Sequence, residues 1–388
     1  MKIIILRGVS CSGKTALEHM VTSGETHLVN VPQLKDEAGA FHRYVTLVEL
    51  TQALEAGDLR AVAEGEGDTF IVDTCIHAEK VVEAFPDAEI TQVALVTSWP
   101  LLLARRRLRY ILAGVRAGVV QNWPRSIRQA TGFSGPNYVE QMTLPGVPTT
   151  WVDTSDYPWE VIPSERVRAT LSPSYVQPDL GDPKELYQQA LHIGGEWRGN
   201  DARIEFERGR QDVVLPEVCD GMAVMDIGCS EGGFLYEVLN RGAAYTLGVE
   251  IRDPQLDLMK RVRNGTYLPL STANVNIDKH PLPSLTGAGG AEAQWDLILL
   301  LNILHRVVDP AAVLKGALSK SKQVVVEAPF YMGLSPCKPE GSHHPGTWHL
   351  PPAWVKGVAE ANGFEVVSIA VGPHAQDQRL VYKLRRRA

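Results

Sequence analysis

The chain has 388 residues, of which 44% are hydrophobic and 21% are charged, and its formal net charge is −7. This length exceeds the size at which one hydrophobic core keeps growing, which predicts two domains, and the composition excludes extensive disorder. The acidic balance excludes a global basic field but is compatible with a basic stripe on one face. Five scattered cysteines without a CxxC pair or Cys/His zinc spacing are typical of reduced thiols.

Neither a cleavable signal nor a membrane span is expected from the sequence. The first apolar run, KIIIL, is short, and nowhere do about 18 apolar residues follow one another, as a spanning helix would require. We therefore expect a cytoplasmic protein without a membrane partner.

The first half of the chain alternates apolar, strand-like runs with helical stretches. Helices are expected over KTALEHMVTSG, closed by Gly24, and over RYVTLVELTQALEAGD. The expected strands are KIIILRG, THLVNV, DTFIVDT, TQVALVTS and TTWVDTS. This βα rhythm predicts a parallel sheet with helices on both faces.

Prolines interrupt the rhythm between Ser155 and Pro183, and a second βα series follows. We therefore predict domains at 1–160 and 185–388, joined by a linker at 161–184. Strands of the second series are expected at MAVMDIG, AYTLGVEI, TYLPLSTANV, WDLILLLNIL and KQVVVEAPF, and a final hairpin at FEVVSIAVG and RLVYKLRRR. The predicted fold class is α/β, with two doubly wound parallel-sheet domains.

The sequence GVSCSGKT follows the first strand and fits the P-loop spacing G-x-x-x-x-G-K-[ST]. In such a loop, backbone N–H groups surround phosphate oxygens, the lysine contacts the β- and γ-phosphates, and the hydroxyl of the last residue ligates Mg²⁺. The spacing thus predicts ATP and Mg²⁺ as cofactors. The expected nucleotide-binding residues are Gly8, Ser10, Ser12, Gly13, Lys14 and Thr15, with Thr15 also a metal ligand.

On this loop, the first domain resembles the small P-loop kinases of the polynucleotide-kinase and zeta-toxin-like kind. The resemblance implies phosphoryl transfer that depends on Lys14. It also implies a carboxylate after the second strand that accepts the substrate proton, where Asp36 stands, and a metal-holding carboxylate at the end of FIVDT, which is Asp73. The close D-x-x-R pairing of that family is absent, because the next arginine is Arg43.

An arginine cluster, LLLARRRLRY, follows the strand TQVALVTS. As a lid of such a kinase, Arg105 and Arg109 would neutralise charge that develops on the transferred phosphoryl group. A solvated basic helix face is an equally ordinary interpretation of this charge run.

A second glycine loop, DIGCSEGGF, stands between a strand and a helix, and Glu250 ends the next strand. Glycines there let the backbone approach a cofactor, and a carboxylate at that distance accepts both ribose hydroxyls. A nicotinamide dehydrogenase would share both features, but its G-x-G-x-x-G spacing is absent.

With the downstream series WDLILLLNILHRVVDP, VVVEAPF and WHLPPAWVKGVAEANGF, the loop resembles motif I of class I S-adenosylmethionine-dependent methyltransferases. The resemblance covers roughly residues 185–388. It implies a seven-stranded Rossmann-like fold that the final hairpin completes, with S-adenosylmethionine as cofactor. The cofactor-binding residues expected are Asp226, Gly228, Ser230, Gly232, Glu250, Asn274 and Asn302.

The methyl acceptor is less clearly indicated. LNILHRV replaces the D/N-P-P-Y/W segment of amino-methylating DNA enzymes, and Leu301 and Leu304 replace the glutamates of metal-dependent RNA 3′-end enzymes. His305 or His349 is a candidate base for an acceptor hydroxyl, because imidazole titrates near neutral pH. Cys337 is better interpreted as structural than as a nucleophile. The pair His343 and His344 lacks a ligand spacing for metal.

These patterns together predict a bifunctional transferase that phosphorylates and methylates a nucleic acid, nucleotide or nucleoside. The alternative is a methyltransferase for a small metabolite, in which the P-loop half is a kinase or a nucleotide-sensing module. The sequence gives no indication of oligomeric state.

Overall fold

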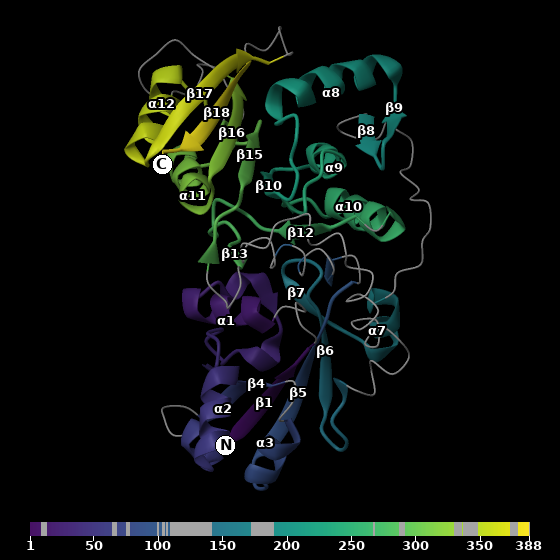
Figure 1. Cartoon of the computed structure of the whole chain (residues 1–388), viewed down its shortest axis with the longest axis vertical. Coiled ribbons are helices and arrows are strands. Elements are labelled where there is room, and N and C mark those ends of the chain that lie inside the picture. Colours follow the sequence, from purple (N-terminus) through teal and green to yellow (C-terminus); the bar gives the residue numbers. More distant parts are fainter. Residues whose placement is uncertain are drawn as a thin grey trace. The chain divides into compact units, whose positions relative to one another are not determined.

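The structure is a computed structural model of the chain. It describes residues 1–8, 14–63, 68–74, 78–98, 101–102, 105, 108, 142–171, 190–266, 268–286, 292–329, 336, 348–372 and 379–387. The chain divides into two compact units, Met1–Ser174 with Thr286–Glu292 and Tyr175–Leu285 with Ala293–Ala388 (Figure 1).

The first unit is α/β, as the alternating pattern predicts. Its described helices are α1 (Lys14–Ser23), α2 (Leu47–Ala56), α3 (Ala78–Ala84) and α7 (Ser164–Leu171), with short 3-10 turns at Thr26–Leu28, Pro32–Leu34 and Leu59–Ala63. Its described strands are β1 (Lys2–Arg7), β2 (Val29–Asn30), β3 (Arg43–Val45), β4 (Thr69–Asp73), β5 (Glu89–Val96), β6 (Thr149–Asp153) and β7 (Trp159–Ile162).

β1, the strand that precedes GVSCSGKT, lies inside a sheet of order β2-β7-β6-β5-β1-β4-β3. β1 pairs in parallel with β5 on one side and with β4 on the other, where Leu6 lies opposite Asp73. Parallel strands end at the same edge of a sheet, so Asp73 lies beside the point where the chain leaves β1 for the loop. The expectation that FIVDT lies next to the P-loop strand is confirmed.

Two predicted elements of this unit differ in the structure. The segment RYVTLVELTQALEAGD is not one helix, because Arg43–Val45 form β3 and α2 begins only at Leu47. A capping box fixes that start: the Glu49 N–H donates to Thr46 Oγ1 at 3.2 Å, and the Thr46 N–H donates to Glu49 Oε2 at 2.7 Å. The strand THLVNV shrinks to Val29–Asn30, which pairs with β7 at the sheet edge.

Part of the predicted linker at 161–184 is folded. Its first residues complete β7, and the next form α7, whose Val167 and Leu171 are buried against β5 and β6. Pro163 stands immediately before α7, where a proline costs no helix hydrogen bond. Residues 172–184 lie outside the described residues.

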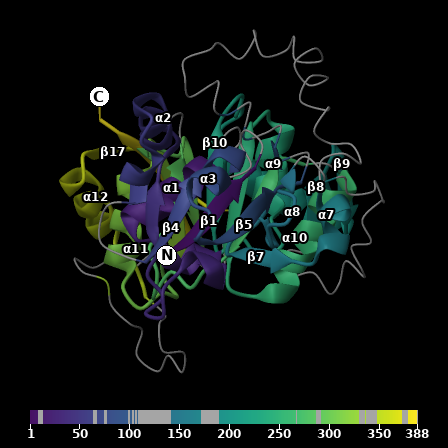
Figure 2. The ribbon, with the colours of Figure 1, turned by 90° about the horizontal axis from the view of Figure 1, so that it is seen from below.

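The core of the first unit forms where α2 and α3 cover β1 and β4, which Figure 2 shows from below. Ile3 and Ile5 of β1 pack there with Val72 of β4, and Leu50 and Val81 come from the two helices. The alternate side chains Ile4 and Leu6 are also fully buried. A strand buried on both faces has a continuous apolar sequence, which explains KIIIL.

The second unit contains the second βα series. Its described helices are α8 (Asp201–Val214), α9 (Gly233–Asn240), α10 (Asp253–Thr266), α11 (Pro310–Lys320) and α12 (Pro352–Ala361). Its main strands are β10 (Ala223–Ile227), β11 (Tyr245–Glu250), β12 (Leu270–Asn274), β15 (Leu297–Leu301), β16 (Gln323–Pro329), β17 (Phe364–Val371) and β18 (Arg379–Arg386). A short pair joins β8 (Ala190–Ile193) to β9 (Glu196–Gly199) in this unit. A second short pair, β13 (Leu285–Thr286) with β14 (Glu292–Ala293), stands at the two chain positions where the division into units falls.

The large sheet of this unit has seven strands in the order β12-β11-β10-β15-β16-β18-β17. The first five are parallel, and β18 runs antiparallel to both β16 and β17. The predicted closing hairpin and the seven-stranded sheet are therefore confirmed.

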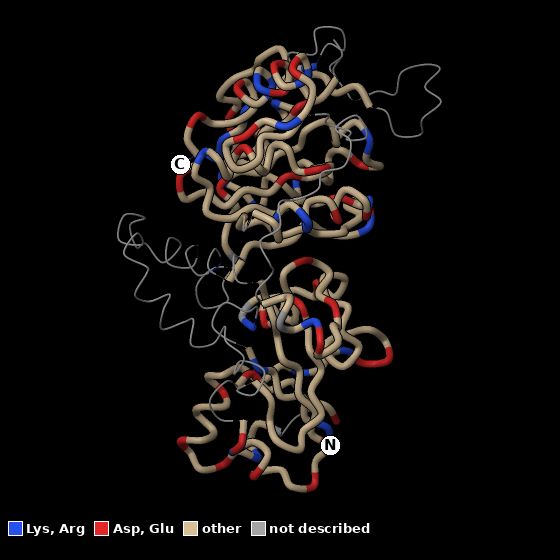
Figure 3. Tube along the Cα trace, turned by 90° about the vertical axis from the view of Figure 1, so that its right-hand side faces the viewer, with Lys and Arg blue, Asp and Glu red and all other residues tan. Residues whose placement is uncertain are grey.

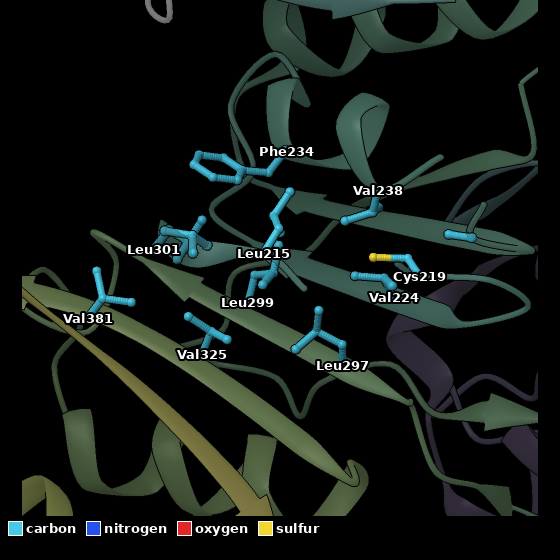
Figure 4. Packing of buried hydrophobic residues seen from close by; sticks show 12 residues of the cluster. Leu215, Cys219, Val224, Phe234, Val238, Leu297, Leu299, Leu301, Val325 and Val381 are labelled. Carbon is cyan, nitrogen blue, oxygen red and sulfur yellow. The ribbon is translucent and has the colours of Figure 1, made fainter. Parts of the chain in front are cut away.

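Helices cover both faces of this sheet: α8 and α9 lie on one side and α11 and α12 on the other (Figure 1). On the α8 and α9 side, Phe234 and Leu215 lie over Leu299, Leu301 and neighbouring side chains from β10, β16 and β18 (Figure 4). This packing joins α8 and α9 to one face of β10 and β15.

The outer strand β17 is unusual in exposing apolar side chains. Val367, Ile369 and Val371 are 53%, 49% and 68% exposed. The register between β17 and β18 shifts between Val366 and Ser368, an irregularity of the β-bulge kind that interrupts the ladder.

Charged residues of both signs are interspersed along the described chain of both units (Figure 3). The negative net charge is thus the balance of many charges rather than one acidic block. In the described part of the chain, every helix is too short or too polar to cross a bilayer.

Candidate functional site

A pocket of about 490 Å³ opens at the carboxyl ends of β10, β11 and β15 in the second unit. Its wall includes the glycine loop after β10, Glu250 at the end of β11, and Asn302 just after β15. Ligands of open α/β sheets bind at this edge, so the pocket is the candidate functional site.

The glycine loop adopts left-handed backbone conformations, as its glycines predict. Gly228 and Gly232 adopt φ values of +73° and +82°, and Ser230 is left-handed as well, with φ +52°. A Cβ on Gly228 would lie 3.0 Å from Ile303 Cδ1, and one on Gly232 would lie 3.0 Å from Met259 Cε. Side chains at these two positions would therefore be both strained and crowded.

Glu250 is buried, and backbone groups hold its carboxylate. Oε2 accepts from the Ser230 N–H at 3.1 Å, and Oε1 accepts from the Ile251 N–H at 2.9 Å. The half-exposed Arg252 side chain donates to Oε1 at 3.3 Å. The glycine loop and the end of β11 are thus joined through a single carboxylate that faces the pocket.

Asp226, the first residue of the predicted motif, is a buried acid in the pocket wall. It is 2% exposed, and its Oδ1 has no hydrogen-bond partner. Burial raises its pKa to about 7, with Arg210 opposing that shift and Glu250 adding to it. Asp226 is therefore a carboxyl whose charge changes near neutral pH, and a cation in the pocket would favour its ionised form.

Behind the pocket, Arg210 of α8 and Glu327 of β16 form a buried ion pair. Arg210 Nε donates to Glu327 Oε2 at 3.1 Å, Nη2 also donates to that oxygen, and Glu327 is fully buried. The Arg210 guanidinium lies 4.7 Å from the Phe234 ring centroid and pairs with Glu207 at 3.6 Å. Burial raises the pKa of Glu207, and Arg210 counters that rise.

Of the two asparagines predicted to bind the cofactor, only one lies in the pocket wall. Asn302 lines the pocket in a left-handed conformation with φ +58°. Its N–H donates to the Glu327 carbonyl at 2.8 Å, and its Nδ2 donates to Glu327 Oε2 at 3.2 Å. Asn274 instead is exposed, donates to Asp253 Oδ1 at 2.5 Å, and does not line the pocket, whose wall continues with Asn276 and Asp278.

His305 is buried between cationic groups. Arg306 Nε donates to its Nε2 at 3.2 Å, so the imidazole proton lies on Nδ1. Burial first, then Arg306, Arg379 and His349, lower the pKa of His305 to about 3. The imidazole is therefore neutral at physiological pH, but it is a weak base whose lone pair is already engaged, which is a poor arrangement for general-base catalysis.

His349 lies near His305 in the second unit and is half-buried. The neighbouring Trp348 N–H donates to the His305 carbonyl at 2.8 Å, which ties the two histidine segments together. Cys337, His343 and His344 lie outside the described residues.

In the first unit, the structure brings Lys14 and Asp73 together. Asp73 is 7% exposed; Oδ2 accepts from the Tyr44 hydroxyl at 3.1 Å, and Oδ1 has no partner. Burial raises the pKa of Asp73, while Lys14 and the Tyr44 hydrogen bond lower it. Lys14 Nζ donates to the carbonyl of Gly8, at the other end of the loop.

The remaining P-loop predictions are only partly described. Ser10, Ser12 and Gly13 lie outside the described residues, as does the side chain of Thr15, whose backbone belongs to α1. Among the described residues, no group of three or more His, Cys, Asp and Glu side chains is arranged to hold a metal ion.

Asp36 does not lie beside the Lys14 and Asp73 pair in the sheet. It follows β2, at the sheet edge, and its exposed carboxylate closes a turn: Oδ1 accepts from the Ala40 N–H at 2.8 Å. Asp side chains favour such turns for this local hydrogen bond.

Arg105 is attached to the ends of β5 and β6. It donates to Thr97 Oγ1 at 3.0 Å and to the Thr154 carbonyl at 2.6 Å. These bonds anchor the segment after β5, which is a structural role that the lid prediction did not include. Arg109 lies outside the described residues.

No protein-family model matches the chain. Over 96 residues it is 29% identical to the ubiquinone biosynthesis O-methyltransferase of Stutzerimonas stutzeri (strain A1501), a match that covers 25% of this chain and 38% of that protein. The chain thus spans well under half the length of this curated relative.

Solved structures of methyltransferases are similar to the chain at low identity. One is the S-adenosylmethionine-dependent methyltransferase of Mesorhizobium loti, with 19% identity and a TM-score of 0.35 over 45% of this chain and 95% of that one. Another is magnesium protoporphyrin IX methyltransferase of Synechocystis PCC 6803 with bound SAH, with 17% identity and a TM-score of 0.37 over 50% of this chain and 90% of that one.

The strand order of the second unit, with β18 antiparallel between β16 and β17, is that of class I S-adenosylmethionine-dependent methyltransferases. The second unit therefore has this Rossmann-like fold. The relatives reported above are methyltransferases, so the kinase interpretation of the first unit rests on its own residues.

Several residues of the two sites escaped the sequence analysis. Glu327 had a visible signal, since it is a lone charge in the otherwise apolar strand VVVEAP. Arg210 and Tyr44 had none, because their partners are 117 and 29 residues away along the chain.

Proposed function

We propose that the second unit binds S-adenosylmethionine and transfers its methyl group to a small-molecule acceptor. The observation that carries this proposal is the position of the pocket, over the carboxyl ends of β10, β11 and β15 in a sheet of methyltransferase strand order. When bound, the cofactor supplies an electrophilic methyl group, and the residues of this chain hold and orient it.

The wall of the pocket fits such a cofactor. Glu250 presents a buried carboxylate suited to a ribose diol, and the left-handed glycines of the loop let its backbone form the pocket wall. Asp226, with its unpartnered Oδ1, suits the positive charge of an ammonium or sulfonium group.

The acceptor class is proposed from the curated relative, which is named as an O-methyltransferase of ubiquinone biosynthesis. We infer a small molecule with an oxygen nucleophile. A nucleic acid, nucleotide or nucleoside acceptor is the competing proposal, and salt-dependent binding of oligonucleotides would favour it.

Calorimetry of the full chain with S-adenosylmethionine, S-adenosylhomocysteine and NAD tests the cofactor. We expect the first two to bind, and Glu250→Ala to weaken binding by about 1–3 kcal/mol through lost charge-assisted hydrogen bonds. The matched control is Glu365→Ala, which removes an exposed carboxylate paired with Arg385 on the outer strands. Binding of NAD alone, or equal effects of the two substitutions, contradicts the proposal.

We further propose that the first unit binds ATP with Mg²⁺ and transfers a phosphoryl group. The supporting observation is that the unpartnered Oδ1 of Asp73 lies beside the end of β1 and that Lys14 is near enough to lower the pKa of Asp73. Asp73 and the Thr15 hydroxyl would hold the ion, which would neutralise phosphate charge. A nucleotide-sensing role is the alternative, and turnover of labelled ATP separates the two.

A further inference from the structure

One face of α8 contributes three charged side chains to the wall of the methyltransferase pocket. Arg203, Glu207 and Arg210 all line it, and their spacing places them on the same side of the helix. Glu207 lies between the two arginines and is 3% exposed. It pairs with Arg203 at 3.2 Å and with Arg210 at 3.6 Å.

One oxygen of this carboxylate accepts no hydrogen bond. Oε1 of Glu207 is buried and without a hydrogen-bond donor in the described part of the chain. Arg203 Nη2 forms its ion pair with Oε1 from outside hydrogen-bond geometry. A buried carboxylate oxygen in this condition is destabilised, so a donor on a ligand in the pocket would stabilise it.

The other carboxylates of the described pocket wall have different surroundings. Glu250 accepts from backbone N–H groups, and Asp278 Oδ1 accepts from the Val308 N–H at 2.8 Å. Asp226 has an oxygen without a partner, but it ends β10 beside the glycine loop, where the proposed function places the positive charge of the cofactor. Glu207 is the carboxylate that the cofactor leaves for the acceptor.

The sheet order separates Glu207 from the expected ribose site. Glu250 ends β11, which neighbours β10 on one side. Arg210, the partner of Glu207, is bonded to Glu327 of β16, which lies two strands from β10 on the other side. A cofactor whose ribose lies at Glu250 therefore leaves the β16 end of the pocket to the acceptor.

We propose that Glu207 is the general base of methyl transfer, and that its Oε1 accepts the hydrogen bond and then the proton of an acceptor hydroxyl. This inference rests on the proposed methyltransferase function and specifies the acceptor as a neutral hydroxyl compound. The hydroxyl oxygen forms a bond to the methyl carbon, and the methyl–sulfur bond breaks with its electron pair left on sulfur. The proton passes to Glu207, so the positive charge of the sulfonium ends as the proton on this carboxylate.

The charges around Glu207 suit this role. Burial raises its pKa; Arg210 and Arg203 of the same helix oppose that rise, and Glu327 of β16 adds to it. The arginines favour the ionised form before the reaction, while burial makes it a stronger base than an exposed glutamate. Proton transfer also replaces a buried anion and a cation by two neutral groups, which a pocket poor in water favours. His305 lacks these properties, because its Nε2 already accepts from Arg306.

The test compares the full chain with Glu207→Gln and with Glu205→Gln, which changes an exposed glutamate of the same helix. Calorimetry with S-adenosylhomocysteine comes first; if the parent does not bind it, the proposed function fails irrespective of Glu207. Transfer of a labelled methyl group from saturating S-adenosylmethionine is then followed across pH, without ATP. Catechol and the more acidic nitrocatechol serve as acceptors.

We expect Glu207→Gln to bind S-adenosylhomocysteine as the parent does and to lose about 10²–10⁴-fold in kcat with catechol. The loss should be smaller with nitrocatechol, which arrives ionised and needs no base. With catechol, the kcat of the parent should rise with pH as Glu207 ionises and then level off, and Glu207→Gln should lack this step. Glu205→Gln should behave as the parent with both acceptors.

Four results would overturn the inference while the parent binds S-adenosylhomocysteine. The parent methylates neither catechol; Glu207→Gln keeps the parental kcat; the variant loses equally with both acceptors, as a merely structural role predicts; or it binds S-adenosylhomocysteine more weakly, which would assign Glu207 to the cofactor.

Discussion

The two units place an acidic residue beside a glycine loop in different ways. Glu250 of the second unit is held by main-chain N–H groups from the loop and from its own strand end. Asp73 of the first unit is held by one side chain, the Tyr44 hydroxyl, and keeps Oδ1 without a partner. A carboxylate fixed by backbone suits a neutral diol, whereas a buried oxygen without a partner suits a cation.

The units also differ in how charge is buried behind the loop. The second unit balances Glu327 against Arg210 inside the fold, whereas in the first unit the charge that opposes the raised pKa of Asp73 is Lys14 of the loop itself. Two similar sheet edges thus neutralise a buried carboxylate differently. In one, a buried arginine pairs with it inside the fold; in the other, the opposing charge is a lysine next to the loop.

The largest expected effect is on stability. Glu327→Ala leaves the Arg210 charge buried without its closest partner, which should lower the free energy of unfolding of the second unit by about 3–5 kcal/mol. Glu365→Ala breaks an exposed ion pair and should cost no more than about 1 kcal/mol. Urea denaturation of both variants measures the difference; similar values would show that the buried pair is not a structural support.

Asp73→Asn should lower activity without lowering the free energy of unfolding. Because burial raises the pKa of Asp73, ionisation opposes folding, and this cost grows as pH rises from the unfolded-state pKa through the folded one. The variant should therefore be as stable as the parent or more stable at pH 7–8. ATP turnover should fall by about 10²–10³-fold, as when one electrostatic contact is removed.

Thermal melts across pH and an assay with labelled ATP check both halves of that prediction. A destabilised variant would show that Asp73 supports the fold. Full turnover in a stable variant would remove Asp73 from the proposed kinase site.

Affinity for S-adenosylmethionine should depend on pH through Asp226. A cationic ligand favours the ionised carboxyl, so with a free-state pKa of about 7 the affinity should fall as pH drops below 7 and level off above it. The limiting slope is about tenfold per pH unit for one proton. Calorimetry between about pH 5.5 and 8.5 brackets the titration of Asp226. For Asp226→Asn it should show an affinity that does not change with pH. A flat profile in the parent contradicts the assignment.

The smallest expected effect concerns Tyr44. Tyr44→Phe removes the hydroxyl that donates to Asp73 Oδ2 and leaves the ring in place. Because the tyrosine acts only through Asp73, loss of this hydrogen bond should weaken ATP–Mg²⁺ binding by about 0.5–1 kcal/mol. Fluorescent-nucleotide titration measures it, with Tyr245→Phe in the second unit as control. An unchanged affinity would mean that Asp73 needs no positioning by the tyrosine.

Much of the fold followed from local sequence. Buried parallel strands are continuous apolar runs, so KIIIL, TFIVD and LILLL were recognisable, and the final hairpin had two such runs near one turn. The start of α2 was missed because the β3 residues Arg43–Val45 extend the helical spacing, and only the capping box separates them. Pro163 suggested a linker, although a proline before a helix is compatible with folding.

Two features of the candidate site could be predicted from the sequence. The glycines indicate a loop that needs left-handed backbone, and the position of Glu250 in the sequence places it at the end of a strand. The roles of Asp36 and Asn274 stay predictions: β2, which precedes Asp36, lies at the sheet edge, and the pocket is lined by Asn276 and Asp278 rather than by Asn274.

The bulge in β17 has a consequence for solubility. A long, regular outer strand with exposed Val367, Ile369 and Val371 would be a template on which a strand from another molecule could pair. The shifted register between Val366 and Ser368 interrupts the ladder of hydrogen bonds and increases the local twist. An interrupted ladder is a poorer template for edge-to-edge pairing, and no charged side chain is exposed on that part of the strand to oppose such pairing.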